Sequence, residues 1–380
     1  MGEKDDPRLA EAKAMPIAEV MARLEIDGLK RAGREMVGPC PRCGGRDRFG
    51  INLQKNLFQC RQCGAKGDQV HLVEFVRGMT FRAALDWLCG PVEGISDAER
   101  AERRKRAEEN AARQARENEA FRRRAIAEAR RIWEEGRPPE DTPVRDYLTR
   151  RGIERRLFPD FPAAIRFHPA RPYMVGEGDG WRELHRGPCM LAAIQAPDNR
   201  FCGVHQTWID LAQPKGKLKL PDPKRPGELL PAKKVHGSKK GGAIRLRPRP
   251  FDGARMVMAE GVETTLSALV ADPTAAIWCG VDLGNMAGQR MLGRGRKYAG
   301  IPDLTDLEAF VPPGWVRDLV FVQDGDSEPR LTRAKLLSGC RRAMARHPGL
   351  RARIAPVPEG MDLNDVLMEA MKADPGEGQA

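Results

Sequence analysis

Four cysteines form two Cys-x-x-Cys pairs, Cys40 with Cys43 and Cys60 with Cys63, and sixteen residues separate the pairs. This spacing is typical of zinc sites in which two knuckles meet around one tetrahedral ion. Residues 38–67 are rich in Gly, Cys and Arg and are too short to bury a core of their own, so we expect a metal to organise them. The pairs therefore predict one structural zinc ion bound by all four thiolates, with redox-active thiols as the alternative.

Acidic residues follow three strand-like segments in the last third of the chain. Glu260 follows RMVMA, Asp324 and Asp326 follow LVFVQ, and Asp362 follows the last such segment, with Asp365 close behind it. Carboxylates at the carboxyl ends of parallel strands converge at one sheet edge, and Mg²⁺ binds a few such oxygens. The pattern predicts a Mg²⁺ or Mn²⁺ site of Glu260, Asp324, Asp326 and Asp362. Each piece alone has another interpretation, since Asp-Gly-Asp is often only a turn.

Basic residues concentrate between Lys215 and Arg249, which we interpret as a basic loop. Cationic side chains beside a glycine pair let phosphates approach closely. We therefore expect Lys239, Lys240, Arg245 and Arg247 to bind the phosphates of a nucleoside triphosphate or of a nucleic acid strand, and the alternative is a solvated loop. The chain has no G-x-x-x-x-G-K-[ST] phosphate loop, so a fused helicase or ATPase motor is not supported.

The elements that must position these residues follow from the hydrophobic pattern. From residue 251 strand-like and helical segments alternate: RMVMA, then VETTLSALVA, AAIWCGV, DLVFVQ, a helix over 329–346 and ARIAPV. Such alternation predicts a parallel sheet. Residues 136–250 carry many prolines and glycines among short apolar runs, which indicates a mixed α/β region.

Upstream, a different pattern predicts helices around the cysteine pairs. Ile17, Val20, Met21 and Leu24 have helical spacing, and two short helices are expected after Gly67, the second capped by Thr80. Residues 97–135 are dense in Glu and Arg without Pro or Gly, which predicts a long, solvated linker helix. Between the cysteine pairs, Phe49 and Phe58 either fill the ribbon's small core or stack unpaired bases.

Composition bounds the class of protein and its partners. The 380 residues carry a formal net charge of +12, which favours a polyanionic partner, nucleic acid first. No long uncharged apolar run and no signal-peptide pattern is present, so we expect a cytoplasmic protein without a membrane partner. The nine cysteines are an odd number, and five of them are scattered singly, which argues against a disulfide framework.

The segment CPRCGGRDRFGINLQKNLFQCRQCGAKGDQVHLVEFVRGMTFRAALDWL resembles the zinc-binding domain of bacterial DNA primases. The similarity covers roughly residues 15–90 and includes a first knuckle, a short sheet, a second knuckle followed by Gly-x-x-Gly-Asp, and then helices. The sequence departs from the family at Cys43, where many members carry histidine. Since cysteine and histidine both bind zinc, the site is expected to survive this change.

The acidic set, in this order on an alternating pattern, resembles the Toprim domain that bacterial primases share with topoisomerases and some nucleases. The resemblance implies that Glu260 acts as acid/base or metal ligand and that Asp324 and Asp326 bind metal. Asp362 and Asp365 match the third acidic motif less tightly, and Glu263 is interpreted as a helix-start residue. The segments around residues 147–153, 202–211 and 233–246 are similar to the region preceding Toprim in plasmid and phage primases.

Together the resemblances imply a DNA primase that makes short primers on single-stranded DNA from nucleoside triphosphates, in a primosome that can include a replicative helicase. The alternatives are a Toprim nuclease and a non-catalytic zinc-ribbon adaptor, whereas a topoisomerase would need a further strand-passage domain. We expect a multidomain α/β protein. Its predicted parts are a zinc ribbon (1–90), a charged helical linker (91–140), a primase N-terminal catalytic subdomain-like region (141–250) and a Toprim domain with a central parallel sheet (251–380).

Overall fold

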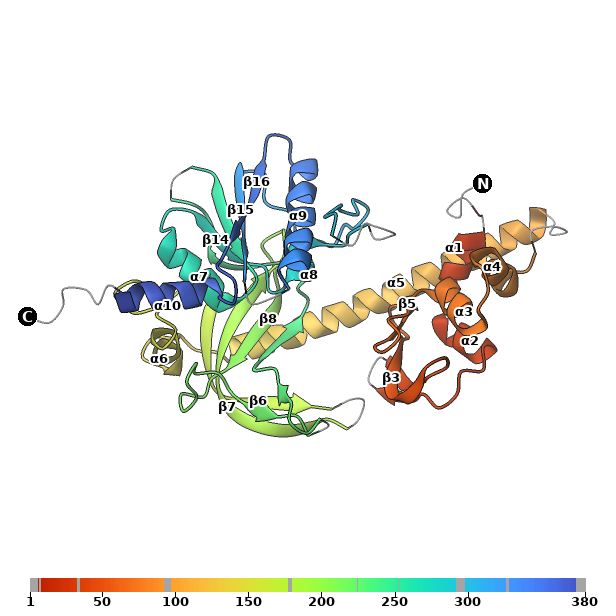
Figure 1. Ribbon diagram of the computed structural model, residues 1–380, viewed down its shortest axis with the longest axis horizontal. Coiled ribbons are helices and arrows are strands. Elements are labelled where there is room, and N and C mark those ends of the chain that lie inside the picture. The colour runs from red at the N-terminus through yellow and green to blue at the C-terminus, as the bar shows by residue number, and fades with distance from the viewer. Residues whose placement is uncertain are drawn as a thin grey trace, which may run out of the picture. The chain divides into compact units, whose positions relative to one another are not determined.

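The computed structural model describes residue 6 and residues 8–32, 35–91, 97–176, 180–223, 225–251, 253–291, 298–325 and 328–373. The chain divides into two compact units (Figure 1). The first comprises Met1–Phe121 with Met174–Leu184, and the second comprises Arg122–Tyr173 with His185–Ala380. Among the described residues, no helix is both long and apolar enough to cross a bilayer. The four-part division expected from the sequence stays a prediction.

The first unit contains an antiparallel sheet and four short helices. The sheet has the order β1-β2-β3-β4-β5, with strands Lys30–Ala32, Glu35–Cys40, Gly44–Asn52, Leu57–Cys60 and Lys66–Gly67. The helices are α1 (Arg8–Ala14), α2 (Ile17–Arg23), α3 (Gln69–Arg77) and α4 (Phe81–Cys89). Thr80 caps α4, as predicted, because its side chain accepts a hydrogen bond from the Ala83 N–H at 3.4 Å.

The predicted long charged helix is confirmed as α5, Asp97–Glu134. Glu102 and Arg106 form one of the expected i to i+4 ion pairs, at 3.2 Å. Nearer its end the helix gains buried residues, Ala129 and Ile132, which belong to the second unit. The helix therefore continues from a solvated stretch into a packed one, as its change in composition requires.

The second unit begins with an antiparallel sheet of order β11-β8-β7-β6. Its strands are β6 (Ile165–Val175), β7 (Arg182–Gln195), β8 (Phe201–Trp208) and β11 (Lys233–Gly237), accompanied by α6 (Pro143–Thr149) and the short pair β9 (Leu220–Pro221) and β10 (Leu229–Leu230). The segment 215–249 is thus not the single basic loop expected from its composition. It contributes four strands, because its backbone pairs with other strands whatever the charge of the side chains, as Lys233–Gly237 of β11 does with β8.

The C-terminal part of this unit has a five-stranded sheet of order β12-β14-β13-β15-β16. The parallel strands are β13 (Arg255–Ala259), β14 (Ala276–Cys279), β15 (Asp318–Gln323) and β16 (Arg351–Pro356). The edge strand β12 (Ile244–Arg247) runs antiparallel to β14, so the sheet begins before residue 251. The helices are α7 (Val262–Ala271), α8 (Leu283–Ala287), α9 (Pro329–Arg346) and α10 (Leu363–Ala373).

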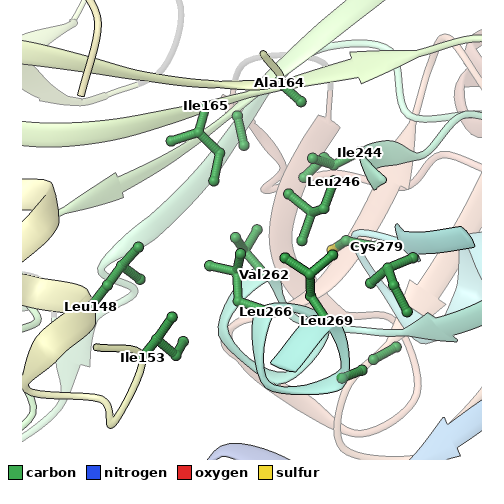
Figure 2. Close-up of a cluster of buried hydrophobic side chains, with 14 of the residues drawn as sticks. Leu148, Ile153, Ala164, Ile165, Ile244, Leu246, Val262, Leu266, Leu269 and Cys279 are labelled. Atoms are coloured by element: carbon green, nitrogen blue, oxygen red, sulfur yellow. The ribbon is translucent and has the colours of Figure 1, made fainter. Parts of the chain in front are cut away.

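Helices cover both faces of this sheet, which explains why its central strands β13, β14 and β15 are largely apolar. Along β13, Val257 packs toward the core that includes α7, whereas Met256 and Met258 pack toward the core that includes α8 and α9. Figure 1 shows α7 and α9 on opposite faces. The first core is continuous with the antiparallel sheet, and Figure 2 shows Ile165 beside the side chains of α7. One shared core therefore fixes the four-stranded and the five-stranded sheet of this unit against each other.

Candidate metal sites and the acidic sheet edge

The two cysteine pairs of the first unit come together at one point. Cys40 ends β2, Cys60 ends β4, and the four sulfur atoms all lie within 4.8 Å of one another. The Cys43 and Cys63 amides donate to the first sulfur of each pair at 3.5 Å, which is the hydrogen bonding of a knuckle. Four thiols at this separation suit a tetrahedral ion with bonds of about 2.3 Å. The donor set therefore fits the predicted zinc.

The acidic edge lies at the carboxyl ends of the central strands of the C-terminal sheet. Glu260 follows β13 and Asp324 follows β15, and these two strands are parallel neighbours. A third carboxylate, Asp282, follows β14 on the other side of β13 and caps α8 through the Asn285 N–H at 2.8 Å. The sheet therefore brings Glu260 and Asp324 to one edge, and it adds Asp282, which we did not expect from the sequence.

The Glu260 carboxyl is only partly exposed and lies in an electrostatically crowded place. Burial raises its pKa, and the nearby Asp282 carboxylate raises it further, while the Leu283 amide and the ammonium groups of Lys335 and Lys233 act in the opposite direction. A carboxyl group with a raised pKa beside further carboxylates is stabilised as an anion by a divalent cation. Binding of Mg²⁺ or Mn²⁺ at this edge stays a prediction, because among the described residues the four cysteines are the only group of three or more His, Cys, Asp or Glu ligands close enough together to hold one ion.

Gly325 explains how the second and third acidic segments meet. A Cβ at this position would lie 2.0 Å from the carbonyl oxygen of Pro358, so only glycine fits. The Gly325 amide donates to the Met361 carbonyl at 2.8 Å, which holds the turn after Asp324 against the loop that leads to Asp362. The predicted ligand Asp326 lies outside the described residues.

Asp362 has a defined structural role in addition to its predicted one. Its carboxylate accepts the Asp365 N–H at 2.7 Å, and the Asp365 side chain accepts the Asp362 N–H at 3.4 Å, which is a capping box at the start of α10. Asp362 also lies 3.6 Å from the buried guanidinium of Arg151. These contacts fix the carboxylate at the start of α10, and metal binding by Asp362 stays a prediction.

The four predicted phosphate-binding residues differ in their surroundings. Lys239 and Lys240 have half-exposed side chains and pair with Asp282 and Glu308. The Arg245 guanidinium donates to the Ala196 carbonyl at 2.7 Å and lies 4.2 Å from the Trp278 ring centre. Arg247 likewise donates to the carbonyls of Asp272 and Ala275. Lys239 thus reaches the acidic edge, whereas the side chains of both arginines donate hydrogen bonds to backbone carbonyls. Phosphate binding by all four residues stays a prediction.

Two protein families match separate parts of the chain. Residues 11–104 match the family described as the CHC2 zinc finger of the DnaG zinc ribbon. The N-terminal segment is a CHC2 zinc finger. Residues 123–246 match a domain of unknown function, DUF7146. No curated protein sequence matches the chain.

Solved primase structures are similar to this chain at low identity. They include the zinc-binding and RNA polymerase domains of the Aquifex aeolicus primase, with 16% identity, 97% of this chain and 83% of that chain covered, and a TM-score of 0.38. The primase fragment of the bacteriophage T7 primase-helicase protein has 14% identity, covers 91% and 96%, and has a TM-score of 0.34. The catalytic core of the E. coli primase has 15% identity, covers 61% and 71%, and has a TM-score of 0.35.

The aromatic residues of the CHC2 zinc finger belong to its core. Phe49 and Phe58 are 0% and 3% exposed, and their ring centres lie 5.7 Å apart. Phe75 of α3 stacks against both. These rings are therefore not available to unpaired bases, and of the two interpretations the structural one is correct.

Sequence reasoning missed the cluster around Glu263. This residue does stand in the first turn of α7, but it is 2% exposed and lies in the interior of the unit. Its carboxylate accepts the Tyr147 hydroxyl at 2.5 Å and the Lys233 ammonium at 2.8 Å, and Lys217 lies 3.2 Å away. Burial alone would raise the pKa of Glu263, but the two lysines and Tyr147 hold it well below its usual range.

A signal for this cluster was present in the sequence. The helix VETTLSALVA is apolar or small around its whole circumference, and residues 262–269 are all buried. A helix of that kind has no solvent-exposed face for a carboxylate. The buried charge of Glu263 therefore needs cationic partners in the interior. Their identity could not be read locally, because Tyr147, Lys217 and Lys233 come from three distant segments.

Proposed function

We propose that this protein is a DNA primase that synthesises short primers on single-stranded DNA. The observation that supports this most directly is the presence in one chain of a CHC2 zinc finger and of carboxylates at adjacent ends of a parallel sheet. The first suits template recognition and the second suits metal-assisted nucleotidyl transfer. Neither feature alone would distinguish primer synthesis from simple DNA binding or cleavage.

In this proposal the acidic edge holds the catalytic metal through Glu260 and Asp324, with Asp326 and Asp362 as further predicted ligands. A bound Mg²⁺ or Mn²⁺ would reduce the charge repulsion between a 3′-hydroxyl and a nucleoside triphosphate. The carboxylates orient and hold the ion, while Glu260, with its raised pKa, is also placed to exchange a proton at the edge. Lys239 pairs with Asp282 near this edge, which supports its proposed role in binding a nucleotide phosphate.

The partners of the proposed enzyme follow from its charge and its zinc finger. The net charge of +12 supports binding of a single-stranded DNA template through phosphate contacts. The nucleoside triphosphates supply the primer, and a replicative helicase is the expected protein partner. We expect the reaction to take place in the cytoplasm.

A primer-synthesis assay tests this proposal. Unprimed single-stranded DNA, labelled nucleoside triphosphates and Mg²⁺ or Mn²⁺ are incubated with the protein, and products are sized on a gel. Labelled short products that disappear in Asp324→Asn support a primase. Shortened DNA without nucleotide incorporation would instead indicate a Toprim nuclease, and DNA binding without either product would indicate a zinc-ribbon adaptor.

A further inference from the structure

We infer that Glu263 is a positioning residue: it holds Lys217 and Lys233 as a pair of ammonium groups beside Glu260, where they bind the phosphates of the incoming nucleoside triphosphate. This inference rests on the proposed function and names a phosphate-binding group for the same site. Neither lysine is among the four phosphate-binding residues expected from the sequence, which are Lys239, Lys240, Arg245 and Arg247.

The cluster is built from backbone segments that cannot easily move. Lys233 begins β11 and is paired with Thr207 of β8, and Lys217 forms an isolated bridge with Ile209. Tyr147 lies on α6 and is 0% exposed, so its hydroxyl fixes the second side of the Glu263 carboxylate. One ammonium group from β11 of the antiparallel sheet and one from the segment that follows β8 thus converge on one carboxylate at the start of α7.

The two lysines of this cluster share the buried Glu263 carboxylate. The next carboxylate that acts on Lys233 is that of Glu260, the predicted metal ligand. Burial lowers the pKa of Lys217; it acts the same way on Lys233, but there the Glu263 carboxylate outweighs it and raises the pKa. An excess positive charge inside a protein costs free energy unless an anion approaches it. Once the Glu260 carboxylate binds a metal, the lysine pair would therefore carry a positive charge that a further anion can neutralise.

Both lysine side chains are partly exposed. The side chains of Lys217 and Lys233 are 27% and 34% exposed, whereas that of Glu263 is 3% exposed. The carboxylate thus anchors the pair from the interior while the lysines face outward in part. An anion with several oxygens, such as a di- or triphosphate, has the charge and the acceptors that this pair lacks.

The pair lies next to the acidic edge. The position that a Cβ would take on Gly261 is 3.8 Å from the Lys233 ammonium nitrogen and 3.8 Å from a Glu263 carboxylate oxygen. Gly261 directly follows Glu260, so the lysine stands one residue from the predicted metal ligand. A nucleotide whose phosphates are held by a metal at Glu260 would therefore have Lys233 within reach of the same phosphates.

Lys217→Met, Lys233→Met and Glu263→Gln test the assignment, with Lys219→Met as the matched control. Lys219 is exposed and lies two residues beyond Lys217 in the same segment. Binding of ATP with Mg²⁺ in the absence of template is measured by calorimetry, and KM and kcat are measured in primer synthesis. Losing one charge-assisted contact should raise Kd and KM for the nucleotide about tenfold, with a smaller change in kcat.

Each variant has a distinct expected behaviour. Lys217→Met leaves Glu263 and Lys233 as a one-to-one pair, so it should keep the thermal stability of the parent while losing nucleotide affinity. Lys233→Arg keeps the charge and should recover most of the affinity that Lys233→Met loses. Glu263→Gln should raise KM although its side chain touches no nucleotide, and Lys219→Met should match the parent. A folded Lys217→Met protein with the parent's Kd and KM would overturn the inference and leave a purely structural cluster.

The outcomes also separate this inference from the proposed function. If the parent protein makes primers and its KM is unaffected in both lysine variants, the inference fails and the primase assignment stands. If the parent binds ATP through the two lysines but incorporates no nucleotide, the inference stands and the primase assignment fails. If the parent neither binds ATP nor makes primers, both are overturned.

Discussion

The metal chemistry expected of Glu260 and Asp324 depends on their position in the sheet. Each follows the last residue of a buried parallel strand, where side chains of adjacent strands meet and water is partly excluded. Many other carboxylates of the chain pair with arginine or lysine on the surface, and such pairs contribute little to stability. Position at the sheet edge, rather than residue type, distinguishes these two acids.

Asp324→Asn and Glu260→Gln are expected to reduce primer synthesis at least about 100-fold, because an amide keeps the shape of the side chain but loses the charge that offsets the metal. Primer synthesis across a Mg²⁺ titration measures the effect. Asp141→Asn serves as the control, since that side chain is 85% exposed. Wild-type rates in both edge variants would show that the acidic edge is structural.

His205 should make the stability of the second unit depend on pH. It is 5% exposed, and burial, followed by the charge on Lys233, lowers its pKa to about 4. In the unfolded chain the pKa is about 6.5, so between these values only the unfolded chain binds the proton. Stability from this residue is full above about pH 6.5 and is lost as the pH falls toward about 4.

The expected loss of unfolding free energy from His205 is about 2 kcal/mol between about pH 7.5 and about pH 5. Urea unfolding followed by tryptophan fluorescence measures it, since Trp208 lies on the same strand. His205→Asn lacks the titrating group and should show a correspondingly weaker pH dependence. An identical dependence in the variant would mean that His205 binds its proton equally well in the folded and the unfolded protein.

Among the elements, the zinc ribbon depends most on a bound group. Most of its strands are short, and its own core residues, such as Phe49, Ile51 and Phe58, pack against helices that precede and follow it. Structural zinc can contribute on the order of 10–16 kcal/mol to the folding of such segments. The helix α4, by contrast, needs no bound group, because its N-cap and its apolar face are supplied by its own sequence.

Cys63→Ser is therefore expected to lose the single zinc ion and to make the ribbon sensitive to proteases. Metal content after gel filtration, together with limited proteolysis, measures both effects. Cys89→Ala is the matched control, because Cys89 lies in the same unit but outside the group of four sulfur atoms, and it should keep its zinc. A zinc-free ribbon that still resists proteases would contradict the structural role of the metal.

For the whole molecule, the net charge of +12 sets the expected behaviour toward DNA. Binding to single-stranded DNA should weaken steeply with salt, because each neutralised phosphate releases counterions. About five phosphate contacts would weaken binding about 100-fold between about 50 and about 200 mM salt. Fluorescence anisotropy with a labelled oligonucleotide measures the slope, and a flat response would show that the basic surface does not bind the strand.

The sequence alone determined the features that depend on local order along the chain. The zinc ligands followed from the spacing of four cysteines, the long helix from a stretch without Pro or Gly, and the parallel strands from alternating apolar segments. Glu260 and Asp324 could be placed at one edge because the carboxyl ends of parallel strands share a direction. Periodicity and spacing are properties of neighbouring residues, so no tertiary information was needed.

Only the tertiary structure decided which distant residues meet. The antiparallel strand β12 joins the C-terminal sheet from a segment that composition describes as a basic loop, because pairing depends on a partner strand elsewhere in the chain. Likewise Glu263 has the sequence context of a helix-start residue, yet Tyr147, Lys217 and Lys233 surround it. Burial of a charge depends on which surfaces pack together, and packing is set by the whole fold rather than by any one segment.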